Sequence, residues 1–183
     1  RSGLLFHADQ LGLEKRKQRM TGEPDELAAR FLNDEYFMRA ALRQAEIAGS
    51  EDEVPIGAVI VDPEEDKIIA EAYNQSEHIL DATAHAELAA IQKACRKLGQ
   101  NRLRGMDLYV TLEPCTMCAG AISFARINNL YFGAYDAKGG AVASGVRFYD
   151  APTCHHQPTV QGGILEEECG QILKDFFRNK RKP

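Results

Sequence analysis

The chain has 183 residues, 44% of them hydrophobic, which is enough for one domain with a sizeable core. No apolar run, Ile56–Val61 included, approaches the roughly 20 residues needed to cross a bilayer, and the N-terminus lacks a signal peptide's apolar segment. We therefore expect a cytoplasmic protein with no membrane contact. The net charge of -5 gives no global indication of nucleic-acid binding. Five cysteines with one close pair favour metal binding over a disulfide framework.

Local composition divides the chain into an extension and one main domain. Residues 1–30 are assigned to an N-terminal extension, because the basic run Glu14–Arg19 interrupts any regular apolar pattern there. Residues 31–183 are assigned to the main domain. A second basic cluster lies near the C-terminus, between Lys174 and Lys182. Both clusters could contact phosphates, although solvated chain ends are the simpler interpretation.

Apolar periodicity predicts a helix followed by a hairpin. The helix spans about residues 33–48, with Asn33 or Asp34 as the cap at its start. Two strands, at residues 54–61 and 68–73, are joined by a short polar turn. Because consecutive strands with a short link pair with each other, these two form an antiparallel hairpin.

Helices and strands alternate in the rest of the chain. Asn74 closes the second strand, and from its position alone it is more simply a turn residue than a ligand contact. A helix is predicted over about residues 84–98, with Thr83 as its cap. The remaining predicted elements are a strand at 108–112, a helix at 115–125, a strand at 129–134 and a helix at 166–179. This order predicts an α/β protein with helices on both faces of a central sheet.

Two short stretches carry the residues that could perform chemistry. Cys115 and Cys118 stand on one face of a predicted helix, and Pro114 suits the entry to that helix. The start of a helix favours the thiolate form of cysteine, which binds metal ions. His85 lies at the start of another predicted helix. If both helices start at the same edge of the sheet, their sulfur and imidazole ligands can reach one ion, and such ligands suit zinc.

Three protein ligands, rather than four, would make this a catalytic zinc site. A structural site is closed by four protein ligands, whereas a catalytic site keeps one position for water. Glu87, two residues after His85, could accept a proton from that water. A fourth ligand from Cys154, His155 or His156 would instead close the site, although a surface loop is the simpler interpretation of that cluster.

The order His-x-Glu followed by Pro-Cys-x-x-Cys resembles the signature of zinc-dependent nucleobase deaminases. The chain resembles the cytidine-deaminase-like superfamily, which implies a three-layer α/β/α fold with a central mixed sheet. Within it, the chain is similar to bacterial tRNA-specific adenosine deaminases, the TadA type. The similarity runs from about Asp34 to Arg178. It rests on Val54–Val59, Asn74, Thr83–Glu87, Leu108–Ala121, Gly133–Ala141 and Asp175–Arg178.

The resemblance implies how the site works. His85, Cys115 and Cys118 would hold one zinc ion per chain. Glu87 would shuttle protons while hydroxide attacks C6 of adenine and ammonia leaves, which gives inosine. The backbone N–H of Ala86 would help to hold the base.

The resemblance also implies a substrate and a partner. The substrate would be the wobble adenosine of a tRNA anticodon loop, a single-stranded base that can be extruded. The target nucleotide and its neighbours would be contacted by Asn74, Asp136 and Lys138, so for Asn74 the resemblance replaces the turn interpretation. The final helix would touch the anticodon loop through Phe176, Phe177 and Arg178. The family is homodimeric, so we expect a homodimer.

Two features depart from the family pattern. The first thirty or so residues exceed the usual start, and Ser144–Val160 lacks the usual Asn-His-Arg. Because that segment borders the substrate side, a deaminase of a free base or nucleoside, such as guanine or cytosine, stays open as an alternative. A zinc-stabilised RNA-binding or partner subunit without activity is a third hypothesis. Glu87 argues against it, since a purely structural site has no need for that carboxylate.

Overall fold

The computed structural model describes the backbone of residues 24–181 and the side chains of residues 32–181. The chain divides into two compact units, residues 1–35 and 36–183, and the sheet lies in the second unit. The basic run Glu14–Arg19 and most of the expected extension lie outside the described residues.

The first described helix, α2, spans Pro24–Ser50 and is longer than predicted. The predicted start at Asn33 or Asp34 is therefore wrong. Proline fits the first turn of a helix, where its missing N–H needs no acceptor, and Pro24 provides that start. The expected boundary of the extension, at residue 30, falls inside this helix.

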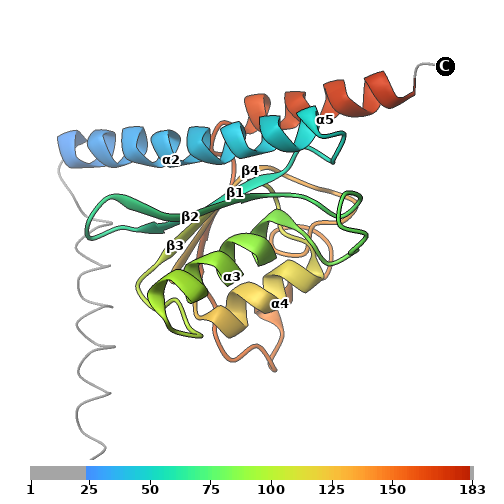
Figure 1. Ribbon diagram of the computed structural model, residues 1–183. Helices are drawn as coiled ribbons and strands as arrows, with labels where there is room; N and C mark the ends of the chain where they lie inside the picture. Colours follow the sequence, from blue (N-terminus) through green and yellow to red (C-terminus); the bar gives the residue numbers. More distant parts are fainter. Residues whose placement is uncertain (1–23, 182–183) are drawn as a thin grey trace, which may run out of the picture. The chain divides into compact units, whose positions relative to one another are not determined.

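Five strands form one mixed sheet in the order β2-β1-β3-β4-β5 (Figure 1). Strand β1 pairs antiparallel with β2, as the hairpin prediction requires, and also antiparallel with β3. Strands β3, β4 and β5 run parallel to one another. The strands are β1 (Gly57–Asp62), β2 (Lys67–Tyr73), β3 (Asp107–Leu112), β4 (Asn129–Ala134) and β5 (Thr159–Gln161).

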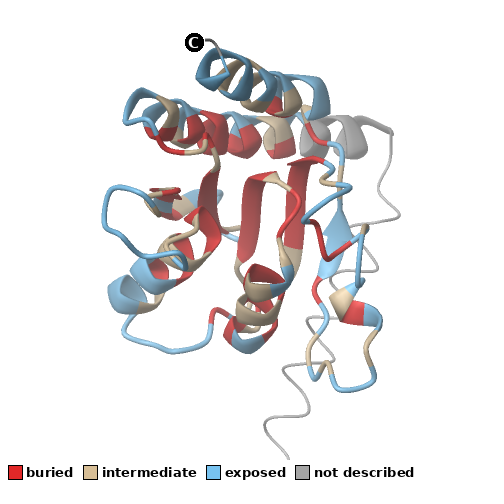
Figure 2. Cartoon of the chain, turned by 90° about the vertical axis from the view of Figure 1, so that its right-hand side faces the viewer, coloured by how far each residue is buried: buried red, intermediate tan, exposed pale blue. Residues whose placement is uncertain are grey.

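Helices cover both faces of this sheet, so the predicted three-layer α/β/α fold is confirmed. Helices α3 (Ala86–Leu98) and α4 (Thr116–Ala125) pack on one face, and α5 (Glu166–Lys180) lies on the other face with the second half of α2. Strands β1, β3 and β4 are buried almost throughout (Figure 2). Sequences such as Ala-Val-Ile-Val in β1 suit strands with both faces covered.

Two buried clusters form the core, one on each side of the sheet. On the α3–α4 side, Ile60, Leu108, Ile122, Leu130 and Phe132 are among the buried residues. The other side includes Phe37, Met38, Val59, Tyr109 and Tyr131. The predicted apolar face of the first helix is confirmed, because Phe37, Ala41, Ala45 and Ala48 are all buried.

The long connection after β4 contains structure that the sequence did not indicate. A short 3-10 helix, η1, spans Phe148–Asp150, and β5 follows it. All three residues of β5 are exposed, so they show no apolar alternation. Within residues 24–181, no helix combines the length and the hydropathy needed to cross a membrane.

Candidate active site

His85 and Cys115 occupy equivalent positions, each as the residue immediately before a helix on the same face of the sheet. His85 precedes α3 with φ -76° and ψ 152°, and Cys115 precedes α4 with φ -72° and ψ 174°. Both backbones are extended, as is usual for the residue before a helix. Cys118 lies in the first turn of α4 and is fully buried.

A local turn, rather than a side-chain cap, sets the start of α3. The carboxylate of Asp81 accepts hydrogen bonds from the backbone N–H of Thr83 at 2.8 Å and from its hydroxyl at 2.7 Å. The prediction that Thr83 caps the helix is therefore wrong, because its hydroxyl is engaged with Asp81. Aspartate commonly forms such turns with the N–H two residues ahead. Here the turn leaves the cap position to His85.

The three predicted metal ligands come together. Nδ1 of His85 lies 3.7 Å from Sγ of Cys115 and 3.5 Å from Sγ of Cys118. In a tetrahedral zinc site, with Zn–N of about 2.0 Å and Zn–S of about 2.3 Å, such atoms are about 3.6 Å apart. The three donor atoms all lie within 4.8 Å of one another. Among the described side chains, no other group of three or more possible ligands meets this criterion.

Electrostatics favour one thiolate at this cluster. Hydrogen bonds with Cys118 and His85 lower the pKa of the Cys115 thiol to about 4. The contact with Cys115, together with burial, raises the pKa of Cys118. The hydrogen bond with Cys115 likewise raises the pKa of His85. A thiolate, a second sulfur and an imidazole form the donor set that zinc prefers.

Glu87 lies beside this cluster and is only 4% exposed. Burial raises the pKa of its carboxyl group, and the nearby imidazole of His85 offsets this only in part. A buried carboxyl group next to a metal site is the kind of residue that exchanges protons with a reacting water. Ala86, between His85 and Glu87, is the first residue of α3. Its N–H is among the first of the helix, which have no acceptor within the helix itself.

Asn74 is 5% exposed, and a buried carboxylate that the sequence did not single out orients it. Nδ2 of Asn74 donates to Oε2 of Glu53 at 3.3 Å, while Oε1 of Glu53 accepts the backbone N–H of His78 at 2.6 Å. Glu53 is itself 1% exposed. It precedes Val54-Pro55, and nothing in its sequence neighbourhood distinguishes it from the exposed acidic residues around it.

The other predicted substrate contacts lie in two places. Asp136 and Lys138 are on the loop after β4, where Oδ1 of Asp136 accepts the backbone N–H groups of Lys138 and Gly139. Phe176, Phe177 and Arg178 are on α5, whose layer is on the opposite face of the sheet from α3 and α4. Phe177 is exposed, and Arg178 pairs with Asp175 at 2.6 Å.

The cluster Cys154, His155 and His156 anchors the segment after η1 to α4. The hydroxyl of Ser123 donates to the carbonyl of His156 at 2.8 Å, and Arg126 donates to the carbonyl of His155 at 2.9 Å. Cys154 and His156 are half-buried and His155 is exposed. The interpretation of this cluster as a surface loop therefore holds only for His155. The cluster is not part of the group of ligands described above.

Comparison with known proteins decides the family. The family model described as the cytidine and deoxycytidylate deaminase zinc-binding region matches residues 32–134. A tRNA-specific adenosine deaminase of Agrobacterium fabrum is 60% identical over 146 residues, which is 80% of this chain and 95% of that protein. The chain belongs to the tRNA-specific adenosine deaminase family. Its Bacillus subtilis relative of the same name is 47% identical over 149 residues, 81% of this chain and 91% of that protein.

Solved structures agree with this assignment. One, from a study of A-to-I editing by tRNA:A34 deaminases at the wobble position of transfer RNA, has a TM-score of 0.73 and 59% identity, covering 75% of this chain and 99% of that one. A guanine deaminase from Nitrosomonas europaea has a TM-score of 0.69 at 21% identity, covering 78% and 83%. At that identity the likeness concerns the fold alone. The zinc-binding family and the His-Cys-Cys cluster fit one zinc ion per chain.

Proposed function

We propose that this chain is a zinc-dependent hydrolase that converts adenosine to inosine at the wobble position of a tRNA anticodon loop. The observation that carries the proposal is the meeting of three metal ligands, with no fourth among the described side chains, beside the buried carboxyl group of Glu87. The substrate is supported by the relatives, which are tRNA-specific adenosine deaminases at up to 60% identity over most of this chain. The deaminase domain is proposed to span residues 31–183, close to where the family model begins.

His85, Cys115 and Cys118 are proposed as the zinc ligands, on the basis of their spacing and donor types. Zinc bound there supplies a Lewis acid that lowers the pKa of water to about 7. Glu87 takes a proton from the attacking water as the water oxygen bonds to C6 of adenine, and it delivers a proton to the amino group on that carbon. The C–N bond at C6 then breaks, and ammonia leaves as the base becomes hypoxanthine. One water is consumed for each ammonia released.

The remaining residues bind and orient the nucleotide. The N–H of Ala86, at the start of α3, holds the base, and the amide of Asn74 contacts the nucleotide from the position that Glu53 fixes. Asp136 and Lys138 contact the target and its neighbours. Phe176, Phe177 and Arg178 contact the anticodon loop, and the exposure of Phe177 and Arg178 supports this role. Stacking on aromatic side chains and charge pairing with phosphates are the usual means of holding single-stranded RNA.

One assay separates this proposal from its rivals. The protein is incubated with bacterial tRNA that carries adenosine at the wobble position, and the RNA is sequenced for inosine. We expect inosine at that position, and no product from the Glu87→Ala variant. A lack of inosine combined with ammonia release from guanine, cytosine or a free nucleoside would contradict the RNA substrate. A lack of both would favour the non-catalytic subunit.

We also propose that the protein is a cytoplasmic homodimer. All five cysteines are free, as expected in a reducing compartment where tRNA is processed. Large apolar side chains are exposed, among them Leu80 at 90% and Phe124 at 80%, and such side chains are common at protein interfaces. Sedimentation equilibrium should give twice the chain mass of 20.3 kDa. A mass of one chain at the concentration used for the assay would contradict the dimer.

A further inference from the structure

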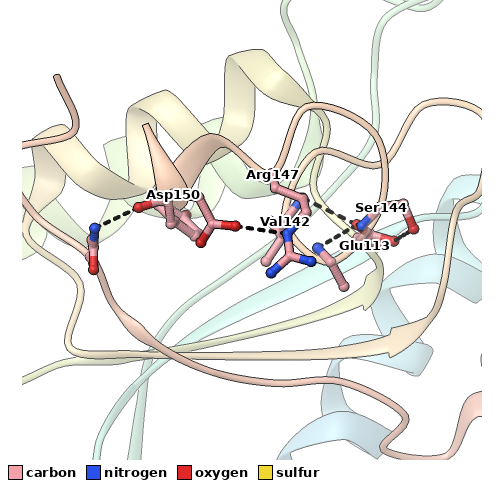
Figure 3. Close-up of polar contacts among 8 residues, drawn as sticks. Glu113, Val142, Ser144, Arg147 and Asp150 are labelled. Atoms are coloured by element: carbon pink, nitrogen blue, oxygen red, sulfur yellow. Dashed lines mark hydrogen bonds and ion pairs between the residues drawn. The ribbon is translucent and has the colours of Figure 1, made fainter. Parts of the chain in front are cut away.

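Glu113 has a carboxylate that collects five hydrogen bonds from one loop. Oε1 accepts the backbone N–H groups of Val142 at 3.1 Å, Ala143 at 2.8 Å and Ser144 at 2.7 Å. Oε2 accepts the backbone N–H of Asp136 at 3.0 Å and the hydroxyl of Ser144 at 2.8 Å. Figure 3 shows the contacts of Glu113 with Val142 and Ser144. Both ends of the loop 136–144 are therefore bound to one side chain.

Glu113 is two residues before the metal ligand Cys115, so its hydrogen bonds connect that loop to the metal centre. Glu113 lies between β3 and Cys115, is 2% exposed, and is followed directly by Pro114. The backbone of the loop also pairs with this segment, since Ala141 N–H donates to the carbonyl of Pro114 at 2.9 Å and Gly140 forms a β-bridge with Cys115. The segment that carries a zinc ligand thus holds the loop that carries Asp136 and Lys138.

The loop fits Glu113 closely. A Cβ atom at Gly140 would lie 2.5 Å from Cδ of Glu113 and 2.5 Å from the carbonyl oxygen of Asp136. Real Cβ atoms essentially never approach other atoms so closely, so only glycine lets the loop close over the carboxylate. Five donated hydrogen bonds also satisfy a buried charge that would otherwise be costly.

We propose that Glu113 is a positioning residue for the reaction, which holds the loop 136–144 at a fixed distance from Cys115. The proposal rests on the proposed function, because Asp136 and Lys138 matter only if this loop contacts the RNA. The backbone amide of Asp136 is bound directly to Glu113, so the carboxylate fixes the backbone position of Asp136 at the start of the loop. Among the described residues, the hydrogen bonds of the Glu113 carboxylate all go to the loop and none goes to a metal ligand, so its effect is on substrate placement.

The test is Glu113→Gln, with the same change at the exposed Glu46 as the matched control. The amide of glutamine keeps the shape but turns one acceptor into a donor, so N–H groups of the loop lose their acceptor. Hydrogen–deuterium exchange should accelerate roughly ten-fold or more at the N–H groups that face the new amide nitrogen, either that of Asp136 or those of residues 142–144, because an unsatisfied buried amide is costly. Exchange in β3 and β4 should stay slow. Zinc content should remain at one per chain.

Steady-state kinetics distinguish a role of Glu113 in placing the substrate from a role in the stability of the fold. With a wobble-adenosine tRNA, KM should rise roughly three-fold or more for Glu113→Gln while kcat changes by less than about two-fold, since the reacting groups are intact. Ser144→Ala removes only the hydroxyl bond and should give a smaller change of the same kind, which keeps the test valid if Glu113→Gln does not fold. Glu46→Gln should change neither exchange nor KM.

Three results would overturn the proposal. Unchanged exchange in the loop would show that Glu113 does not hold it. Faster exchange with unchanged KM and kcat would show that the loop's position is irrelevant to the reaction. Loss of zinc from Glu113→Gln would show that Glu113 supports the metal ligands instead. If the wild-type protein makes no inosine, the proposed function fails, and the exchange result alone still decides whether Glu113 anchors the loop.

Discussion

Sγ of Cys118 lies 3.5 Å from Nδ1 of His85, although 33 residues separate the two along the chain. The two side chains come from the starts of α4 and α3, which pack on the same face of the sheet. Cys115 completes the group from the position immediately before α4. The metal ligands therefore come from two helices. Their binding of zinc can be measured directly, without an assay of turnover.

Cys118→Ala should abolish zinc binding and activity. The variant removes one of three ligands, and two protein ligands do not hold zinc in a catalytic site. Elemental analysis of the purified protein should find about one zinc per wild-type chain and well under half of that in the variant. Cys95→Ala changes a half-buried thiol on α3 that packs against the core, and it should keep its zinc. Equal zinc in wild type and Cys118→Ala would exclude Cys118 as a ligand.

Glu87→Gln should keep zinc and lose turnover. The amide has the shape of the carboxyl group but cannot accept and return a proton, and general acid–base groups contribute roughly 10²–10⁴-fold to rate. Single-turnover inosine formation on tRNA should therefore fall by about that factor. The exposed Glu46→Gln provides the control for the same chemical change. If zinc is lost from Glu87→Gln, then Glu87 is a ligand and the proton-transfer role is wrong.

Glu53 and Asn74 should act as a coupled pair. Glu53→Gln leaves one oxygen to accept both from Nδ2 of Asn74 and from the backbone N–H of His78, so one donor loses its partner. Asn74→Ala removes the proposed nucleotide contact itself. In a double-mutant cycle on kcat/KM, the two changes should be non-additive by about 0.5–3 kcal/mol. Strict additivity would mean that Glu53 does not act through Asn74.

Gly57→Ala should destabilise the fold at the contact between β1 and α2. A Cβ atom at Gly57 would collide with the backbone of α2 at Ala41 and Ala45, and neither backbone can rotate away. We expect a loss of about 1–3 kcal/mol in the free energy of unfolding, measured by urea titration. Gly49→Ala is the matched control, because its Cβ atom would meet only Cβ of Pro55 at 3.5 Å. Equal midpoints for the two variants would contradict the close contact.

Sequence patterns predicted the parts of this molecule that depend on periodicity or on ligand spacing. The strands near residues 57–62 and 129–134 stand out because both of their faces are apolar. Cys115 and Cys118 stand out because a helix start places their sulfurs on one face. Their approach to His85 followed from two predicted helix starts, and the structure brings the three side chains together.

Other features depend on tertiary partners that no local pattern reveals. Glu53 and Glu113 are ordinary acidic residues in the sequence, and donors from segments distant along the chain, backbone N–H groups among them, make them buried acceptors. Thr83 was a reasonable cap, but the carboxylate of Asp81 competes for its hydroxyl. Strand β5 is exposed at all three residues, so no apolar pattern in the sequence indicates its pairing with β4.

The positions of His85 and Cys115, one residue outside their helices, have a consequence for how this protein can change. Helices α3 and α4 end at Leu98 and Ala125, and the residues that follow them, Gly99 and Arg126, both have left-handed backbone conformations. Turns added or removed at those far ends would leave the spacing of the donor atoms unaltered, since that spacing depends only on where the helices start. A change in the length of either helix at its far end therefore leaves the metal-ligand distances unchanged. Insertions should be tolerated far better after Gly99 than between Thr83 and Glu87.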